Sequence, residues 1–151
     1  MKVLKKKINQ YPLGIWIAIV ALILISLAWL MQGYSLLDWE AAVALGVQNE
    51  RFTGDAAERA IADVERGVAL ADIVWALHLT IIAFIGLLRK RFIGFITAMM
   101  VFAICVYFPL FYLFRESMDT ETVLAALFLW TIPSLLGIIG LWVNKEIFNS
   151  N

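Results

Sequence analysis

The sequence predicts an all-α fold: a four-helix transmembrane bundle with a partly helical extracytoplasmic loop between its first two helices. Three observations lead to this prediction. First, 63% of the 151 residues are hydrophobic and 16% are charged, whereas soluble domains are ~45–50% apolar and ~25% charged. Second, four windows are long and apolar enough to cross a bilayer. Third, the segments between the windows alternate between basic and acidic. We therefore expect a single integral membrane domain over residues 1–151, with the lipid bilayer as its solvent.

Each candidate span has about the twenty residues that a membrane helix needs. The windows cover residues 13–31, 67–88, 92–114 and 122–144. Asp72 is the one charged residue inside them. Because lipid offers the backbone no hydrogen-bond partner, each window should be a helix. Pro109 and Pro133 remove backbone donors inside the third and fourth windows and should kink these helices.

The charges outside the windows predict the topology. Residues 1–12 hold four lysines and no acid, and residues 89–91 are three consecutive basic residues. Residues 32–66 hold seven acids and three bases, and residues 115–121 are also acidic on balance. Because cytoplasmic loops are enriched in Lys and Arg, we expect both termini in the cytoplasm. The expected location is a cell membrane, with the bacterial inner membrane as the natural case.

A cleaved signal peptide is the competing interpretation of the first window. Ser26-Leu27-Ala28 has the small-x-small pattern of a cleavage site after a basic start. A signal peptide, however, has an apolar region of only ~7–15 residues. The apolar run here is longer and continues past this site, so we favour a retained span.

The outer loop, residues 32–66, should contain a short helix. Ser35 and Asp38 have capping-box spacing before an apolar run at residues 39–45. Such a run is suited to lie on the membrane surface. Gly46 can end this helix, because glycine adopts the left-handed conformation that follows many helices.

A second helix should begin in the loop and continue into the second span. Asp55 is placed to cap it, with Glu58 three residues on in capping-box spacing. Gly67 is the only helix breaker between this cap and the end of the second window. Ion pairs of Arg59 with Asp55 and Asp63, each four residues apart, should support the part of the helix outside the bilayer.

Small residues fall on one side of each predicted helix. They are Gly14, Ala18, Ala21 and Ala28 in the first window, Ala76, Ala83 and Gly86 in the second, Gly94 and Ala98 in the third, and Ala126, Gly137 and Gly140 in the fourth. Small residues let membrane helices approach closely, so these sides should be packing seams. A lined cavity is the alternative interpretation, because small side chains also leave room.

Six residues form the candidate ligand site. They are Asp72, Trp75, Tyr112, Trp130, Glu65 and His78. A carboxylate facing lipid is costly, so Asp72 should face the bundle interior. Tyr112 and Trp130 lie in the same outer half, and each can donate a hydrogen bond to a carboxylate. We expect Asp72 close to both, in a pocket open to the outer leaflet.

A structural ion pair is the alternative role for Asp72. Glu58, Glu65 and Asp72 recur every seven residues and so share a helix face, without a basic residue three or four positions away from any of them. Any cation would have to come from another element, and Arg51 and Arg115 are the candidates on the outer side.

The sequence predicts neither a metal nor a cofactor. The chain has one histidine, His78, and one cysteine, Cys105, whereas zinc and haem sites need further strong ligands. It contains no GxSxG, HExxH, Walker or GxGxxG pattern. We therefore predict no catalytic residues and no metal site, and we expect His78 to be a structural histidine that binds no haem.

The expected function follows from the four apolar spans, the candidate ligand site and the lack of catalytic or metal-binding motifs. We expect a small polytopic membrane protein of non-enzymatic type, which packs with partner subunits or binds a lipophilic ligand. Its partners would be the lipid bilayer and a membrane protein or a second copy. Nucleic acid is excluded, because twelve basic and twelve acidic residues cancel. The alternative is a membrane-embedded enzyme or proton-coupled device that uses Asp72 and His78.

Overall fold

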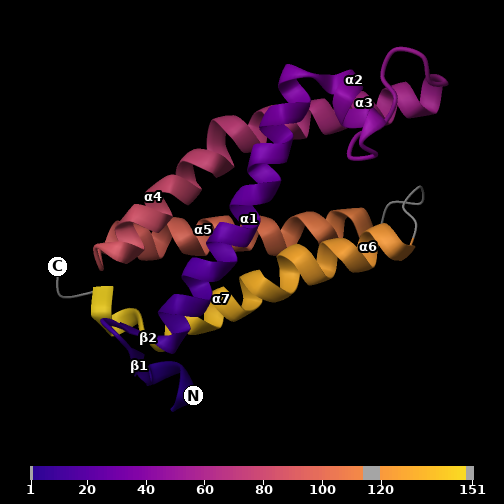
Figure 1. Ribbon diagram of the computed structural model, residues 1–151. Helices are drawn as coiled ribbons and strands as arrows, with labels where there is room; N and C mark the ends of the chain where they lie inside the picture. The colour runs from indigo at the N-terminus through magenta and orange to yellow at the C-terminus, as the bar shows by residue number, and fades with distance from the viewer. Residues whose placement is uncertain (1, 114–119, 149–151) are drawn as a thin grey trace. The chain divides into compact units, whose positions relative to one another are not determined.

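The computed structural model describes residues 2–113 and 120–148, and these are helical apart from loops and one short hairpin (Figure 1). In chain order the elements are the 3₁₀ turn η1 (Val3–Lys5), strands β1 (Lys7–Ile8) and β2 (Tyr11–Pro12), helices α1 (Leu13–Leu37), α2 (Trp39–Ala44) and α3 (Ala56–Ala71), the π turn η2 (Asp72–Ala76), helices α4 (Leu77–Leu88), α5 (Phe92–Leu113) and α6 (Thr120–Ala126), the π turn η3 (Leu127–Thr131), helix α7 (Ile132–Val143) and the 3₁₀ turn η4 (Lys145–Phe148). The predicted all-helical class is confirmed.

Within the described residues, four helices are long and apolar enough to cross a membrane. They are Leu13–Leu37, Ala56–Leu88, Phe92–Leu110 and Val123–Val143. Each overlaps one of the predicted windows, and the first two extend beyond theirs. The second is the longest, because α3, η2 and α4 follow one another without a break, so that Gly67 lies inside a continuous helix.

The chain divides into two compact units. Unit 1 comprises Met1–Ile25 and Leu79–Asn151, and unit 2 comprises Ser26–His78. Helices α1 and α4 each begin in one unit and end in the other. In unit 1, α5 packs along α7 and along the π turn that precedes it (Figure 1).

Glycines on different helices of unit 1 meet backbone to backbone. A Cβ added to Gly94 of α5 would lie 2.2 Å from the carbonyl carbon of Gly86 in α4. A Cβ added to Gly140 of α7 would lie 2.3 Å from the carbonyl oxygen of Gly14 in α1. No side chain fits at such distances. At these four glycines the predicted seams are therefore places where helices pack, as small residues allow in membrane proteins.

The sequence pattern does not predict the antiparallel hairpin that precedes α1. Ile8 of β1 pairs with Tyr11 of β2. Between them Asn9 has a φ of 55°, a left-handed conformation that asparagine tolerates in turns. The hydroxyl of Tyr11 donates to the carbonyl oxygen of Leu88 at 2.6 Å. The hairpin is thus fastened to the last residue of α4, where the helix leaves carbonyls without backbone donors.

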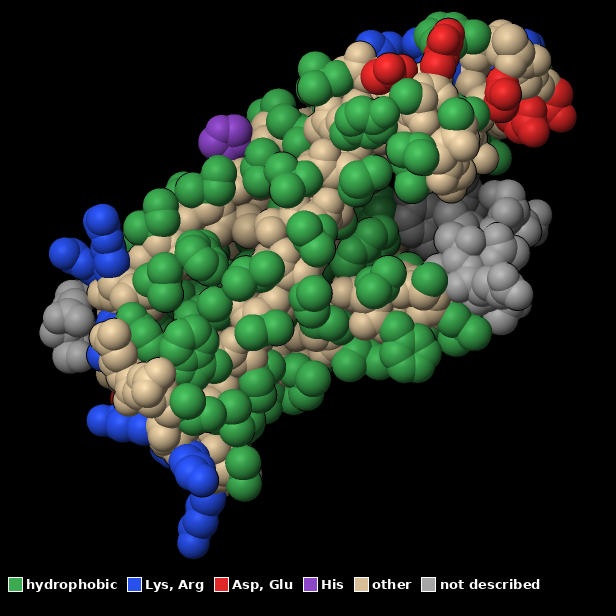
Figure 2. All heavy atoms as spheres, viewed as in Figure 1, with side chains coloured by type: hydrophobic (Ala, Val, Ile, Leu, Met, Phe, Trp, Pro, Cys, Tyr) green, Lys and Arg blue, Asp and Glu red, His purple; other side chains and the backbone are tan. Residues whose placement is uncertain are grey.

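Basic side chains gather where the hairpin, the α4–α5 turn and the end of α7 meet. The Asn144 side-chain nitrogen donates to the carbonyl oxygens of Leu4 at 3.2 Å and Gly140 at 2.8 Å. The ammonium of Lys90 lies 5.1 Å from the centroid of the Tyr11 ring. Figure 2 shows the Lys and Arg side chains of unit 1, in blue, at this end.

Where the sequence predicts a kink at Pro133, the helix widens into the π turn η3. The N–H of Ile132 bonds to the carbonyl of Leu127, five residues earlier. Pro133 itself has no N–H, and its ring crowds the carbonyl four residues before it, so a wider turn eases that contact. Beside it, the hydroxyls of Thr131 and Ser134 are buried without a hydrogen-bond partner among the described residues.

In unit 2, α1 runs on to Leu37, past the predicted end of the first span. Ser35 lies inside this extension and donates to the carbonyl of Met31 at 3.0 Å, as serine hydroxyls inside helices commonly do. The prediction that Ser35 opens a capping box was therefore wrong. Asp38 caps α2 instead, accepting from the N–H of Ala41 at 3.0 Å.

The other predicted helix boundaries in unit 2 are confirmed. Helix α2 ends at Ala44, and Gly46 follows with a φ of 71°. At the start of α3, the Asp55 carboxylate accepts from the N–H of Glu58 at 2.9 Å. The Glu58 carboxylate accepts from the N–H of Asp55 at 3.0 Å. Both hydrogen bonds of the predicted capping box are present.

The predicted ion pairs of Arg59 were wrong. Arg59 donates from Nη1 to the carbonyl oxygen of Gly54 at 2.8 Å. Asp63 forms its ion pair with Arg51 from the preceding loop, at 2.9 Å. Among the described residues Arg59 pairs with neither Asp55 nor Asp63, because the folded loop offers each group a nearer partner than the exposed helix surface does.

Candidate functional site

The loop between α2 and α3 is tied to three helices of unit 2. The indole N–H of Trp39 donates to the carbonyl of Asn49 at 3.0 Å. The amide nitrogen of Asn49 donates to both carboxylate oxygens of Glu65, at 2.8 and 3.0 Å. The amide of Gln48 donates to the side-chain oxygen of Gln32 in α1 at 3.1 Å. These contacts give the loop one defined conformation against the helices.

Arg51 of this loop and Arg66 of α3 line the same cavity, and they differ in whether their charge is paired. Arg51 donates from Nε to Asp63 at 2.9 Å, and its guanidinium lies 5.0 Å from the centroid of the Phe52 ring. Arg66 of α3 is exposed and forms no ion pair with any residue that the structure describes. One arginine is therefore neutralised, whereas the other keeps its charge available to a ligand.

Two cavities adjoin these arginines. The first, of about 270 Å³, is lined by Ser35, Leu36, Leu37, Asp38, Trp39, Glu40, Arg51, Phe52 and Arg66. The second, of about 350 Å³, is lined by Leu36, Arg51, Asp63, Arg66, Gly67 and Leu70. Leu36, Arg51 and Arg66 belong to both linings, so the two cavities adjoin at these residues. We call the two adjoining cavities together the arginine groove, and all of their lining residues belong to unit 2.

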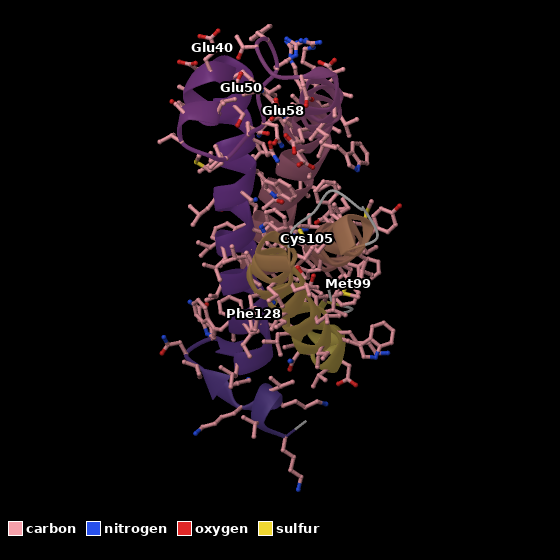
Figure 3. All side chains as sticks on the ribbon, turned by 90° about the vertical axis from the view of Figure 1, so that its right-hand side faces the viewer. Glu40, Glu50, Glu58, Met99, Cys105 and Phe128 are labelled. Carbon is pink, nitrogen blue, oxygen red and sulfur yellow. The ribbon has the colours of Figure 1, made fainter. Side chains whose placement is uncertain are left out.

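The arginine groove is polar at one end and apolar at the other. The first cavity has the carboxylates of Asp38 and Glu40 on its wall, and Figure 3 shows Glu40 at the same end of unit 2 as Glu50 and Glu58. The second cavity ends on Gly67 and Leu70, which begin the apolar part of the long helix. A groove that changes in this way matches an amphiphile, with its polar group among charges and its chain along leucines.

The residues predicted as a ligand site have several different environments. Glu65 holds Asn49 of the loop. Asp72 is half-buried and opens the π turn η2. Trp75 is 59% exposed, and His78 is exposed, with its Nδ1 3.1 Å from the carbonyl oxygen of Ile73. The linings of the two cavities of the arginine groove include none of these predicted residues.

The remaining two predicted residues belong to unit 1. Trp130 is half-buried within the π turn η3. The side chain of Tyr112 lies outside the described residues, as does Arg115, one of the two cations proposed as a partner for Asp72. The other, Arg51, pairs with Asp63. The proximity of Asp72 to Tyr112 and Trp130 stays a prediction.

Sequence reasoning missed the residues that form the arginine groove. Arg66 directly precedes Gly67, where the apolar window begins, and arginines near the ends of membrane helices extend to the interface where headgroups lie. Arg51, by contrast, joins the groove only because the loop folds back on α3. No pattern along the chain predicts that the loop folds back on α3.

The described residues contain no group of three or more His, Cys, Asp and Glu side chains that could hold a metal ion. Comparisons with protein families, with curated proteins and with solved structures found no match to this chain.

Proposed function

We propose that this protein is a small multi-pass membrane protein of non-enzymatic type that binds a lipophilic ligand in the arginine groove. The observation that carries the proposal is that an arginine and two leucines line one cavity. Arg66, a cation without an ion-pair partner among the described residues, lines it together with Leu36, near the end of α1, and Leu70, near the start of the apolar part of the long helix. A charged end and an apolar wall in one groove favour a ligand with both characters.

The proposal places the groove on the outer side of the membrane. Its support is the gathering of Lys and Arg side chains at the end of unit 1 formed by the N-terminal hairpin, the α4–α5 turn and the end of α7 (Figure 2). Short basic segments stay in the cytoplasm. The acidic loop that carries the groove would then face the opposite side, at the level of the outer headgroups.

Occupying the groove with a larger side chain tests the proposal. Leu36 lines both cavities and is half-buried. In Leu36→Trp the indole should fill the groove, and native mass spectrometry of the gently solubilised protein should show several-fold less retained lipid than for the wild type.

The matched control is Leu30→Trp, which makes the same change on the same helix at a residue that is 60% exposed and outside both linings. It should retain lipid as the wild type does. Equal retention by wild type, Leu36→Trp and Leu30→Trp would show that the groove holds no lipophilic ligand.

A further inference from the structure

Five charged side chains line the arginine groove, namely Asp38, Glu40, Arg51, Asp63 and Arg66. Arg51 is paired with Asp63 at 2.9 Å. The carboxylate of Asp38 is engaged at the start of α2 by the N–H of Ala41. Arg66 and Glu40 are both exposed, and neither forms an ion pair with a described residue. The Asp38 carboxylate keeps its charge but already accepts a hydrogen bond, so the groove offers a ligand one cation, Arg66, and one carboxylate without a hydrogen-bond donor among the described residues, Glu40.

A ligand with one charge would satisfy only half of this pair. An anionic headgroup would meet Arg66 but would also face the Glu40 carboxylate on the wall of the same cavity. A headgroup with both a phosphate and an ammonium meets both residues with opposite charge. Guanidinium and phosphate form strong charge-assisted hydrogen bonds, and a primary ammonium supplies three donors to a carboxylate.

The apolar end of the groove indicates that the ligand carries a hydrocarbon chain. Leu70 is 56% exposed and lines the second cavity together with Leu36 and Gly67. A Cβ added to Gly67 would meet nothing within 4 Å, so space is open along the helix at the point where the apolar window begins. A chain lying there would bury these leucines as it enters the bilayer.

We propose that the arginine groove binds a zwitterionic phospholipid with a primary ammonium, of the phosphoethanolamine class, from the outer leaflet. Its phosphate lies against Arg66 and its ammonium against Glu40, while an acyl chain follows Leu36 and Leu70. The proposal rests on the proposed function, because it names the ligand class of the same groove. The distinction from phosphocholine lipids lies in hydrogen bonding, since a quaternary ammonium has no N–H to donate to Glu40.

Competition among three lipids with identical acyl chains tests the proposal. The purified full-length protein is exchanged into mixed micelles that contain equal amounts of phosphoethanolamine, phosphocholine and phosphoglycerol lipids, and retained lipid is measured by native mass spectrometry. We expect the phosphoethanolamine lipid to be retained about tenfold over each of the others, the ratio that one additional charge-assisted hydrogen bond provides.

Two variants that each remove one charge test which residue contacts the phosphate and which contacts the ammonium of the headgroup. Glu40→Gln should lower retention of the phosphoethanolamine lipid to the level of the phosphocholine lipid and leave the latter unchanged. Arg66→Gln should lower retention of all three lipids by a similar factor. The controls Glu146→Gln and Arg89→Gln remove one charge of each sign from exposed residues that do not line the groove, and they should retain the wild-type pattern.

The outcomes separate the two proposals. Preference for the phosphoglycerol lipid, or a Glu40→Gln variant with the wild-type selectivity, would overturn the zwitterionic headgroup while leaving the groove as a lipid site. Failure of the proposed function would instead appear as lipid retention that neither Arg66→Gln nor Leu36→Trp changes.

Discussion

The Nδ1 atom of His78 lies 3.1 Å from the carbonyl oxygen of Ile73, five residues earlier in the same helix. The π turn η2 explains why this carbonyl is available. In that turn the N–H of Leu77 bonds to the carbonyl of Asp72, also five residues earlier. When such a turn returns to an α-helix, one carbonyl is left without a backbone donor. The imidazole supplies that donor, and so the histidine and the π turn support each other.

We predict that neutral His78 carries its proton on Nδ1. A carbonyl oxygen only accepts hydrogen bonds, so the ring nitrogen beside it must donate. Nitrogen-15 NMR of the histidine-labelled protein in lipid should show a protonated Nδ1 and a bare Nε2. A spectrum of the Nε2-protonated form would contradict the assignment.

The same contact predicts the effect of removing the ring. His78→Ala should destabilise the protein by about 1–3 kcal/mol, the cost of leaving a carbonyl unsatisfied away from water. Ile81→Ala is the matched control in the same helix, since Ile81 is 48% exposed and lipid solvates apolar side chains well. Denaturation in detergent should separate the two variants, and equal midpoints would show that the imidazole contact contributes no stability.

Alanine substitution at two glycines of the long apolar helices should change the stability of the protein in opposite directions. A Cβ at Gly94 would lie 2.2 Å from the carbonyl carbon of Gly86, where only backbone atoms could yield. Gly94→Ala should therefore cost about 1–3 kcal/mol or more, as overpacking does. Gly67→Ala meets open space and should stabilise the helix by about 0.5–1 kcal/mol.

Thermal unfolding of the two detergent-solubilised variants checks this prediction. The contact between α4 and α5 would not be as close as described if Gly94→Ala unfolded at the wild-type temperature. Gly86→Ala should behave like Gly94→Ala, because it adds a methyl group to the other side of the same contact.

Asn144 should control the protection of the amino-terminal segment. Its side-chain nitrogen reaches the carbonyls of Leu4 and Gly140, and Asn144 is 5% exposed. Asn144→Leu keeps the branched shape of the side chain but removes both donors, so trypsin should cleave after Lys5 and Lys6 several-fold faster than in the wild type. Unchanged cleavage would mean that the hairpin holds this segment without Asn144.

The control for that experiment is Glu146→Gln, an exposed substitution two residues further along. It alters charge near the same end of unit 1 without touching either hydrogen bond, so cleavage of the amino-terminal segment should proceed at the wild-type rate.

Both termini should face the cytoplasm. The basic residues 1–12 and 89–91 stand against the acidic segment 32–66, and this is the charge bias of cytoplasmic and outer loops. Alkaline phosphatase fused after residue 50 should be active, whereas a fusion at the carboxyl terminus should be inactive. An active carboxyl-terminal fusion would reverse the proposed topology and place the arginine groove on the cytoplasmic side.

The local features of the fold could be predicted because their causes are local. The capping box of Asp55 and Glu58 needs only residues three apart, and the stop at Gly46 needs only the conformational freedom of one glycine. Ser35 shows the limit of such patterns. Its spacing to Asp38 fits a capping box, but α1 continues through it, and its hydroxyl bonds to a carbonyl of the same helix instead.

Composition and periodicity alone predict four apolar helices. Each window has the length of a bilayer and almost no charge, and in lipid its backbone groups can form hydrogen bonds only within the segment. The partners of the charged side chains were decided only when the chain folded. Asp63 takes Arg51 rather than Arg59 because the loop between α2 and α3 brings a distant residue closer than a helical neighbour. The arginine groove arises in the same way, from residues of α1, α2, the loop and α3 that meet only in the tertiary structure.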